Sequence, residues 1–212
     1  MYRKLVLYLL DNKLFNQFVQ YILPKIFWRK PKFPDKQMVE QIHSRMINVF
    51  QLRFRAPENY KGIIISSRDP SKVTGLLIPT DIDHSAVIVG YFTELRDFGV
   101  IEAVASGVRL VSLRDFIRTS EAVTCHVGEG WDNYYRRMVT ITALLFRGKP
   151  YDRKFKFGAE SLYCSEISYE CDVEKRCKYN LDDFAGIGRE YISPKGITEA
   201  VGMVKIFDSE IE

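Results

Sequence analysis

Short apolar runs separated by turn residues constrain the fold of this 212-residue chain more than any other feature. From Tyr60 onward the sequence contains the runs GIIIS, GLLIP, SAVIVGYF, GVIEAV and VRLVSL. Glycine, proline and polar residues stand between them. Runs of this length that are rich in valine and isoleucine are typical of β-strands joined by short connections. The pattern therefore predicts a small, mainly antiparallel sheet.

Helical patterns follow and interrupt these strands. The segment SLRDFI predicts a short helix, AVTCHV predicts a further strand, and residues 131–147 predict a helix that ends at Gly148 and Pro150. After Cys164 the segment SEISYECDVEKRC predicts another helix, and the apolar run AVGMVKIF lies near the end of the chain. This mixture of a small sheet and helices indicates the α+β class.

The region before the strands predicts a helical arm, residues 1–57, ahead of a domain that spans residues 58–212. In residues 5–28 one helical side is apolar and the other carries lysine, asparagine and glutamine. We expect the apolar side to pack on the rest of the protein. Trp28 and the basic residues after it also allow it to lie on a membrane surface. Beyond the linker RKPKFPDK, Asp35 is the predicted N-cap of a second helix. His43 lies within that helix and is predicted to be structural or at the surface.

Composition and charge exclude few partners. The 31 lysines and arginines exceed the 27 acidic residues by only four, which is too small an excess for a nucleic-acid-binding surface. The four cysteines lack CxxC spacing, so we expect a reducing compartment, no metal site and no cofactor. The N-terminal apolar run is too short for a signal peptide or a membrane span. These features predict a cytoplasmic or virion-associated protein.

Three residue types suit nucleophilic catalysis. Cys164 is predicted at a helix N-terminus, where backbone N–H groups favour a thiolate and could bind an oxyanion. His84 opens an apolar strand and could act as the base, and Glu102 stands within a neighbouring apolar strand, where an imidazole would be a suitable partner. The residues alone also allow a core thiol, a surface histidine and a solvent-facing glutamate.

The segments HSAVIVG, VIEAVASGVRLVSLRDFI and RGKPYDRKFKFGAESLYCSEISYEC, in this order, resemble the circularly permuted papain-like hydrolases of the NlpC superfamily, in particular the YiiX-like branch. The resemblance implies a permuted papain-like domain with Cys164 as the nucleophile, His84 as the base and Glu102 as the third residue. Tyr163 and Asp152 belong to the same signature. Tyr163 could form a pocket wall or simply pack, and Asp152 could bind substrate, although capping a turn is favoured.

These expectations together predict a cysteine hydrolase that cleaves an amide or ester bond through an acyl-enzyme. The substrate would be a cell-wall peptide or a lipid-like acyl compound. Two other functions stay open. One is a non-catalytic binding or virion-structural protein, in which Cys164 is inert. The other is a membrane-associating adaptor that makes contact through residues 5–28.

Overall fold

A computed structural model describes residues 32–68, 82–158, 160–183 and 188–210. The predicted helix over residues 5–28 and the predicted strand GLLIP lie outside these residues. Within them, no helix is both long and apolar enough to cross a membrane.

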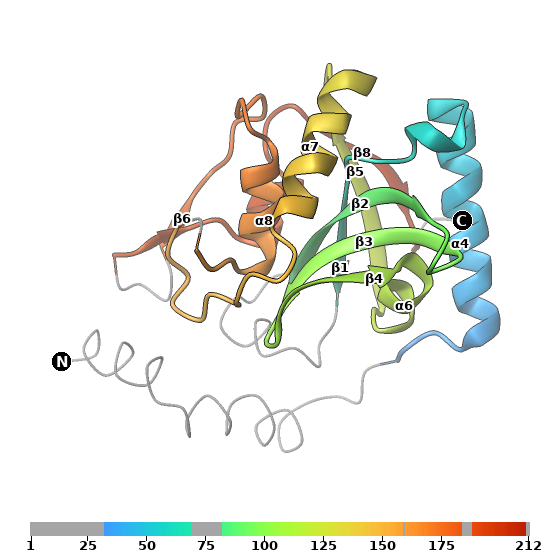
Figure 1. The fold of residues 1–212 in the computed structure, drawn as a ribbon, viewed down its shortest axis with the longest axis horizontal. Coiled ribbons are helices and arrows are strands. Elements are labelled where there is room, and N and C mark those ends of the chain that lie inside the picture. Colours follow the sequence, from blue (N-terminus) through green and yellow to red (C-terminus); the bar gives the residue numbers. More distant parts are fainter. Residues whose placement is uncertain (1–31, 69–81, 159, 184–187, 211–212) are drawn as a thin grey trace.

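The centre of the fold is a six-stranded sheet in which every neighbouring pair is antiparallel, as predicted (Figure 1). The spatial order is β4-β3-β2-β1-β5-β8. Two short strands, β6 (Asp182–Asp183) and β7 (Glu190–Tyr191), form a separate ribbon. The six strands are β1 (Ile63–Arg68), β2 (His84–Phe92), β3 (Asp97–Val104), β4 (Gly107–Ser112), β5 (Ala122–Gly128) and β8 (Met203–Asp208).

Helices cover both faces of this sheet, because alternate strand residues are apolar on each face. Val87 and Val89 of β2 belong to the core beneath α7 (Asn133–Leu145) and α8 (Cys164–Cys171). Ala86 and Ile88 belong to the opposite core, beneath α4 (Lys36–Phe54) and α6 (Leu113–Arg118). Figure 1 shows α7 and α8 on one side of the sheet and α4 on the other. The α+β class and the sheet packed on helices are therefore confirmed.

Helix α4 begins as predicted, since the Asp35 carboxylate accepts the N–H of Met38 at 2.8 Å. Its buried residues Val39, Ile42, Met46 and Phe50 share a core with the sheet. This part of the predicted arm is thus packed on the domain, and the boundary at residue 58 stays a prediction. A short 3-10 helix, Pro57–Asn59, leads into β1.

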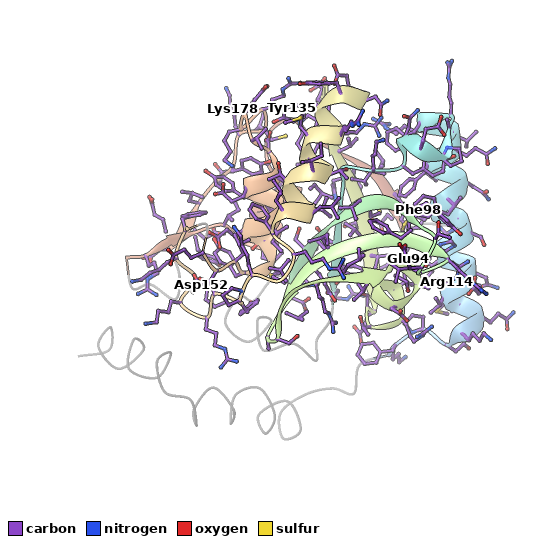
Figure 2. The ribbon with its side chains drawn as sticks, in the orientation of Figure 1. Glu94, Phe98, Arg114, Tyr135, Asp152 and Lys178 are labelled. Atoms are coloured by element: carbon purple, nitrogen blue, oxygen red, sulfur yellow. The ribbon has the colours of Figure 1, made fainter. Side chains whose placement is uncertain are left out.

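A polar network also attaches α4 to the sheet, on the side where Figure 2 shows Phe98 and Arg114. His43 Nε2 lies 2.9 Å from Asp97 Oδ1, and Arg114 Nη1 lies 3.0 Å from the same oxygen. Burial opposes ionisation of Asp97. The hydrogen bond and the charge of His43, together with the backbone N–H of Arg114, outweigh burial and hold the pKa of Asp97 below its usual value. The structural interpretation of His43 is confirmed.

The predicted extent of the helix after Cys164 is wrong. Helix α8 ends at Cys171 instead of continuing to residue 177, because the Asp172 backbone leaves the helical region at ψ 72°. The Asp172 carboxylate then accepts the N–H groups of Arg176 and Cys177, each at 2.9 Å, which the helix would otherwise have used. The last helix is α9 (Pro194–Thr198).

Candidate active site

The start of β2 and the middle of β3 bring two predicted site residues together. Ala86 is the register partner of Glu102, so His84 lies diagonally across from that carboxylate. His84 Nε2 is 2.8 Å from Glu102 Oε2, and the two residues are only 1% and 3% exposed. The expected contact between the glutamate and an imidazole on the neighbouring strand is therefore present.

Packing holds the His84 ring in this orientation. The ring stacks on Phe116 of α6, with centroids 5.7 Å apart and an interplanar angle of 21°. The strand is anchored just before it, because the N–H of Asp83 donates to the carbonyl of Ser67 at 3.1 Å. A buried ring with a fixed hydrogen bond and a stacked neighbour has little rotational freedom, which suits a residue that exchanges protons.

Glu102 has a second partner that the sequence did not reveal. Arg109 of β4 is its direct cross-strand neighbour and donates to Oε1 from Nε at 2.9 Å. Opposite charges at paired strand positions are the signal for such a contact, but this signal requires the strand register.

Cys164 is the first residue of α8 and is 2% exposed. Its predicted position at a helix N-terminus is thus correct. Helix α8 packs on β2, and the hydroxyls of Ser85 and Ser168 lie 2.7 Å apart. Ser85 follows His84 in the chain, and Ser168 is one helical turn beyond Cys164. This contact docks the N-terminal half of α8 on the beginning of the histidine strand.

Three tyrosines lie near enough to Cys164 to interact with it electrostatically. Burial raises the pKa of Tyr151, Tyr163 and Tyr191, and for each of them the nearby Cys164 adds to the rise. For Tyr191, with Asp182 also contributing, the pKa reaches about 12. These phenols stay protonated at neutral pH, so the thiol has neutral and partly apolar neighbours.

Tyr163 and Asp152 both have structural contacts. The Tyr163 hydroxyl accepts the N–H of Ile192 at 3.0 Å, and its ring packs 5.1 Å from that of Phe155. Asp152 accepts the N–H groups of Lys154 and Lys156 at 2.8 and 2.6 Å, and Figure 2 shows it in the loop before α8. Asp152 thus caps a turn, as favoured, and substrate binding by either residue stays a prediction.

Glu166 is a buried carboxyl close to Cys164 that the sequence analysis did not single out. It accepts the N–H of Gly158 at 2.9 Å and that of Tyr163 at 3.3 Å. Burial raises its pKa to about 8; the two N–H groups lower it, and the nearby Asp152 and Glu170 raise it. A glutamate three residues after the helix N-cap is a recognisable capping signal, although its burial is not visible in the sequence.

The other three cysteines are buried in the core. Burial raises the pKa of Cys125, Cys171 and Cys177, that of Cys177 to about 11. The core interpretation of Cys171 is confirmed, since it is fully buried. Among the residues that the structure describes, no group of three or more histidine, cysteine or acidic residues could hold a metal ion.

Comparison with known proteins identifies the fold and the family. No curated protein matches the chain. The crystal structure of the metalloprotein YiiX from Escherichia coli O157:H7 matches with a TM-score of 0.58 and 19% identity, over 70% of this chain and 96% of that one. At this identity the match shows the fold alone. A family model described as permuted papain-like amidase enzyme, YaeF/YiiX, C92 family matches residues 59–180, more than half of the chain. The protein therefore belongs to the permuted papain-like amidases of the YaeF/YiiX family.

Proposed function

We propose that the protein is a cysteine-dependent amidase that uses Cys164 as its nucleophile, His84 as its base and Glu102 as the group that orients the base. The buried hydrogen bond between His84 and Glu102 carries this proposal. A histidine and a glutamate with less than a twentieth of their surface exposed need a specific reason to be ionisable there, and a catalytic site supplies one.

The chemistry assigned to each residue follows from its position. Glu102 engages Nε2 of His84, so the other ring nitrogen, Nδ1, takes the proton of the Cys164 thiol. The thiolate sulfur attacks the carbonyl carbon of the substrate, and the N–H groups in the first turn of α8 stabilise the oxyanion. His84 then gives its proton to the leaving amine, the C–N bond breaks, and a thioester with Cys164 remains.

Water completes the reaction. His84 removes a proton from a water molecule, whose oxygen attacks the thioester carbonyl. The C–S bond breaks, the acid product leaves, and the proton held by His84 returns to the sulfur. Glu102 accepts the Nε2–H bond throughout and stabilises the imidazolium that forms in each half of the cycle.

An amide in a cell-wall peptide and an ester or amide of a lipid-like acyl group are the two proposed substrate classes. The amphipathic pattern of residues 5–28 and the net charge of +4 favour the acyl group, since both suit a lipid or membrane-adjacent substrate. Turnover of a peptidoglycan fragment and of an N-acyl amide, measured side by side with Cys164→Ser as the blank, would separate the two classes.

The experiment that tests the catalytic set is alkylation of Cys164 by iodoacetamide as a function of pH, followed by mass spectrometry. We expect Cys164 to react at pH 6 at least about tenfold faster than free cysteine, and to lose this advantage in His84→Ala. The buried Cys125 and Cys171 are internal references, and His126→Ala removes a comparable buried strand histidine. A Cys164 that reacts no faster than free cysteine and is indifferent to His84 would favour the non-catalytic binding protein instead.

A further inference from the structure

We propose that Arg109 is a positioning residue that keeps the Glu102 carboxylate ionised and directed at His84. The inference rests on the proposed function, because it concerns the orienting residue of that site. The two Glu102 oxygens have different partners: Oε2 faces His84 Nε2 at 2.8 Å, and Oε1 faces Arg109 Nη2 at 2.8 Å and Nε at 2.9 Å. Glu102 therefore bridges the imidazole and the guanidinium.

Exposure separates the roles of the two partners. The side chain of Glu102 is 4% exposed and that of His84 is 2% exposed, whereas that of Arg109 is 53% exposed. The guanidinium thus contacts the carboxylate from the solvent side, and the imidazole contacts it from the interior. An ordinary surface ion pair would have both partners in water and would contribute little. Here one partner is a buried carboxylate, which takes up a proton unless a cation balances its charge.

Arg109 supplies a charge that does not change during the reaction. In the proposed cycle His84 alternates between neutral and protonated forms, so it balances Glu102 only part of the time. If Glu102 took up a proton, its O–H would become a donor and the hydrogen bond to Nε2 would reverse. A guanidinium is charged at every working pH, and two of its N–H groups hold Oε1, which leaves Oε2 for the imidazole. Glu102 can then accept from Nε2–H in both states of His84.

Other groups near Glu102 and His84 add negative charge or none at all. The buried Asp83 lies immediately before β2 and adds a second acidic residue to the region. On α6, Phe116 covers the imidazole, while the exposed Asp115 pairs with Arg118. The cross-strand contact from β4 thus provides a permanent cation for Glu102, through Arg109.

Nitrogen-15 NMR of the histidine rings tests the inference directly. The chain has three histidines, so the His84 signals can be assigned by their loss in His84→Ala. In the native protein we expect Nε2 to carry a proton that is hydrogen-bonded to a carboxylate. Arg109→Met should shift the Nε2 signal in the same direction as Glu102→Gln does, and Arg109→Lys should keep the signal closer to its native position. In a Glu102→Gln protein, the additional Arg109→Met change should cause no further shift of the Nε2 signal.

A His84 ring whose signals and pH titration are the same in Arg109→Met as in the native protein would overturn the inference. So would a native ring with an unprotonated Nε2, since Glu102 would then be the donor. Because the NMR readout needs no reactive thiol, it decides the role of Arg109 even if Cys164 proves inert and the proposed function fails.

Alkylation of Cys164 gives the second readout. Losing the cation beside Glu102 favours the protonated form of this carboxyl, which stabilises the His84 imidazolium less, so the acid limb of the rate profile should move to higher pH in Arg109→Met. At a fixed pH on that limb the rate therefore falls. Arg96→Met, at an exposed arginine in the β2–β3 turn, is the matched control and should leave the profile unchanged. An unshifted profile in Arg109→Met, alongside an activated thiol, would contradict the positioning role.

Discussion

Replacing Glu166 with glutamine is expected to remove a large part of the pH dependence of stability between pH 4.5 and 8. Glu166 is fully buried in the first turns of α8, and its carboxyl accepts two backbone N–H groups. Among the described residues its hydrogen bonds come from backbone N–H groups and not from a guanidinium or ammonium group, so amide dipoles alone stabilise its ionised form. Glutamine has nearly the same shape and carries no charge at any pH.

The expected magnitude follows from the pKa of Glu166. That pKa is about 8 in the folded protein, against 4.5 for an ordinary glutamate. The difference of about 3.5 units corresponds to about 5 kcal/mol at most, at about 1.4 kcal/mol per unit. Because the folded pKa is the higher one, the folded state favours the protonated form. The contribution of Glu166 is therefore complete below pH 4.5, is lost as the pH rises towards 8, and changes no further above that.

Urea denaturation at a series of pH values from 4.5 to 9 measures this effect. The free energy of unfolding of Glu166→Gln minus that of the native protein should increase across this range and level off above pH 8. Subtraction removes the contributions of other groups, such as Asp97. Glu94→Gln, at an exposed glutamate labelled in Figure 2, should give a flat difference. Parallel curves for the native protein and Glu166→Gln would refute the reasoning.

Two further predictions concern other parts of the molecule. Asp172→Asn should lower the free energy of unfolding by about 2–4 kcal/mol. The buried carboxylate accepts from the hydroxyls of Tyr135 and Tyr179 as well as from backbone N–H groups, and an amide cannot accept from all of them. Urea denaturation measures the loss, with the exposed Asp182→Asn as the control. Removing residues 1–30 should abolish flotation with anionic liposomes, whereas Cys164→Ser should float as the native protein does. Equal flotation of the shortened chain would exclude membrane contact through residues 5–28.

The strands of the central sheet could be predicted because their signal is local. Alternating or continuous apolar runs, bounded by turn residues, define β1 to β5 within a few positions, and Asp35 marks the start of α4 by its own side chain. The end of α8 could not be predicted in this way. Asp172 stops the helix through contacts that include Tyr135, which is 37 positions away in the sequence. Only the folded chain brings the two together.

In the candidate site, too, residues with a local signal could be predicted and residues that depend on the tertiary fold could not. Cys164, His84 and Glu102 each stand in a recognisable local setting, a helix start or a strand, and so could be named from the sequence. Arg109 could not, because its relevance depends on the register that pairs β3 with β4. The Ser85–Ser168 contact, which docks α8 on β2, is likewise visible only once both elements are placed.

Two buried glutamates near the site illustrate how the fold assigns charge. Glu102 and Glu166 are the same residue type at similar burial, and neither sequence setting predicts a charge state. Glu102 contacts a guanidinium and an imidazole, whereas the hydrogen bonds of Glu166 come from backbone N–H groups, and its pKa rises to about 8. A carboxyl that orients a base must stay ionised, while a carboxyl that only caps a helix can be neutral. In the proposed mechanism, the contact with His84 places Glu102 to orient the base, and the cross-strand arginine would keep it ionised for that role.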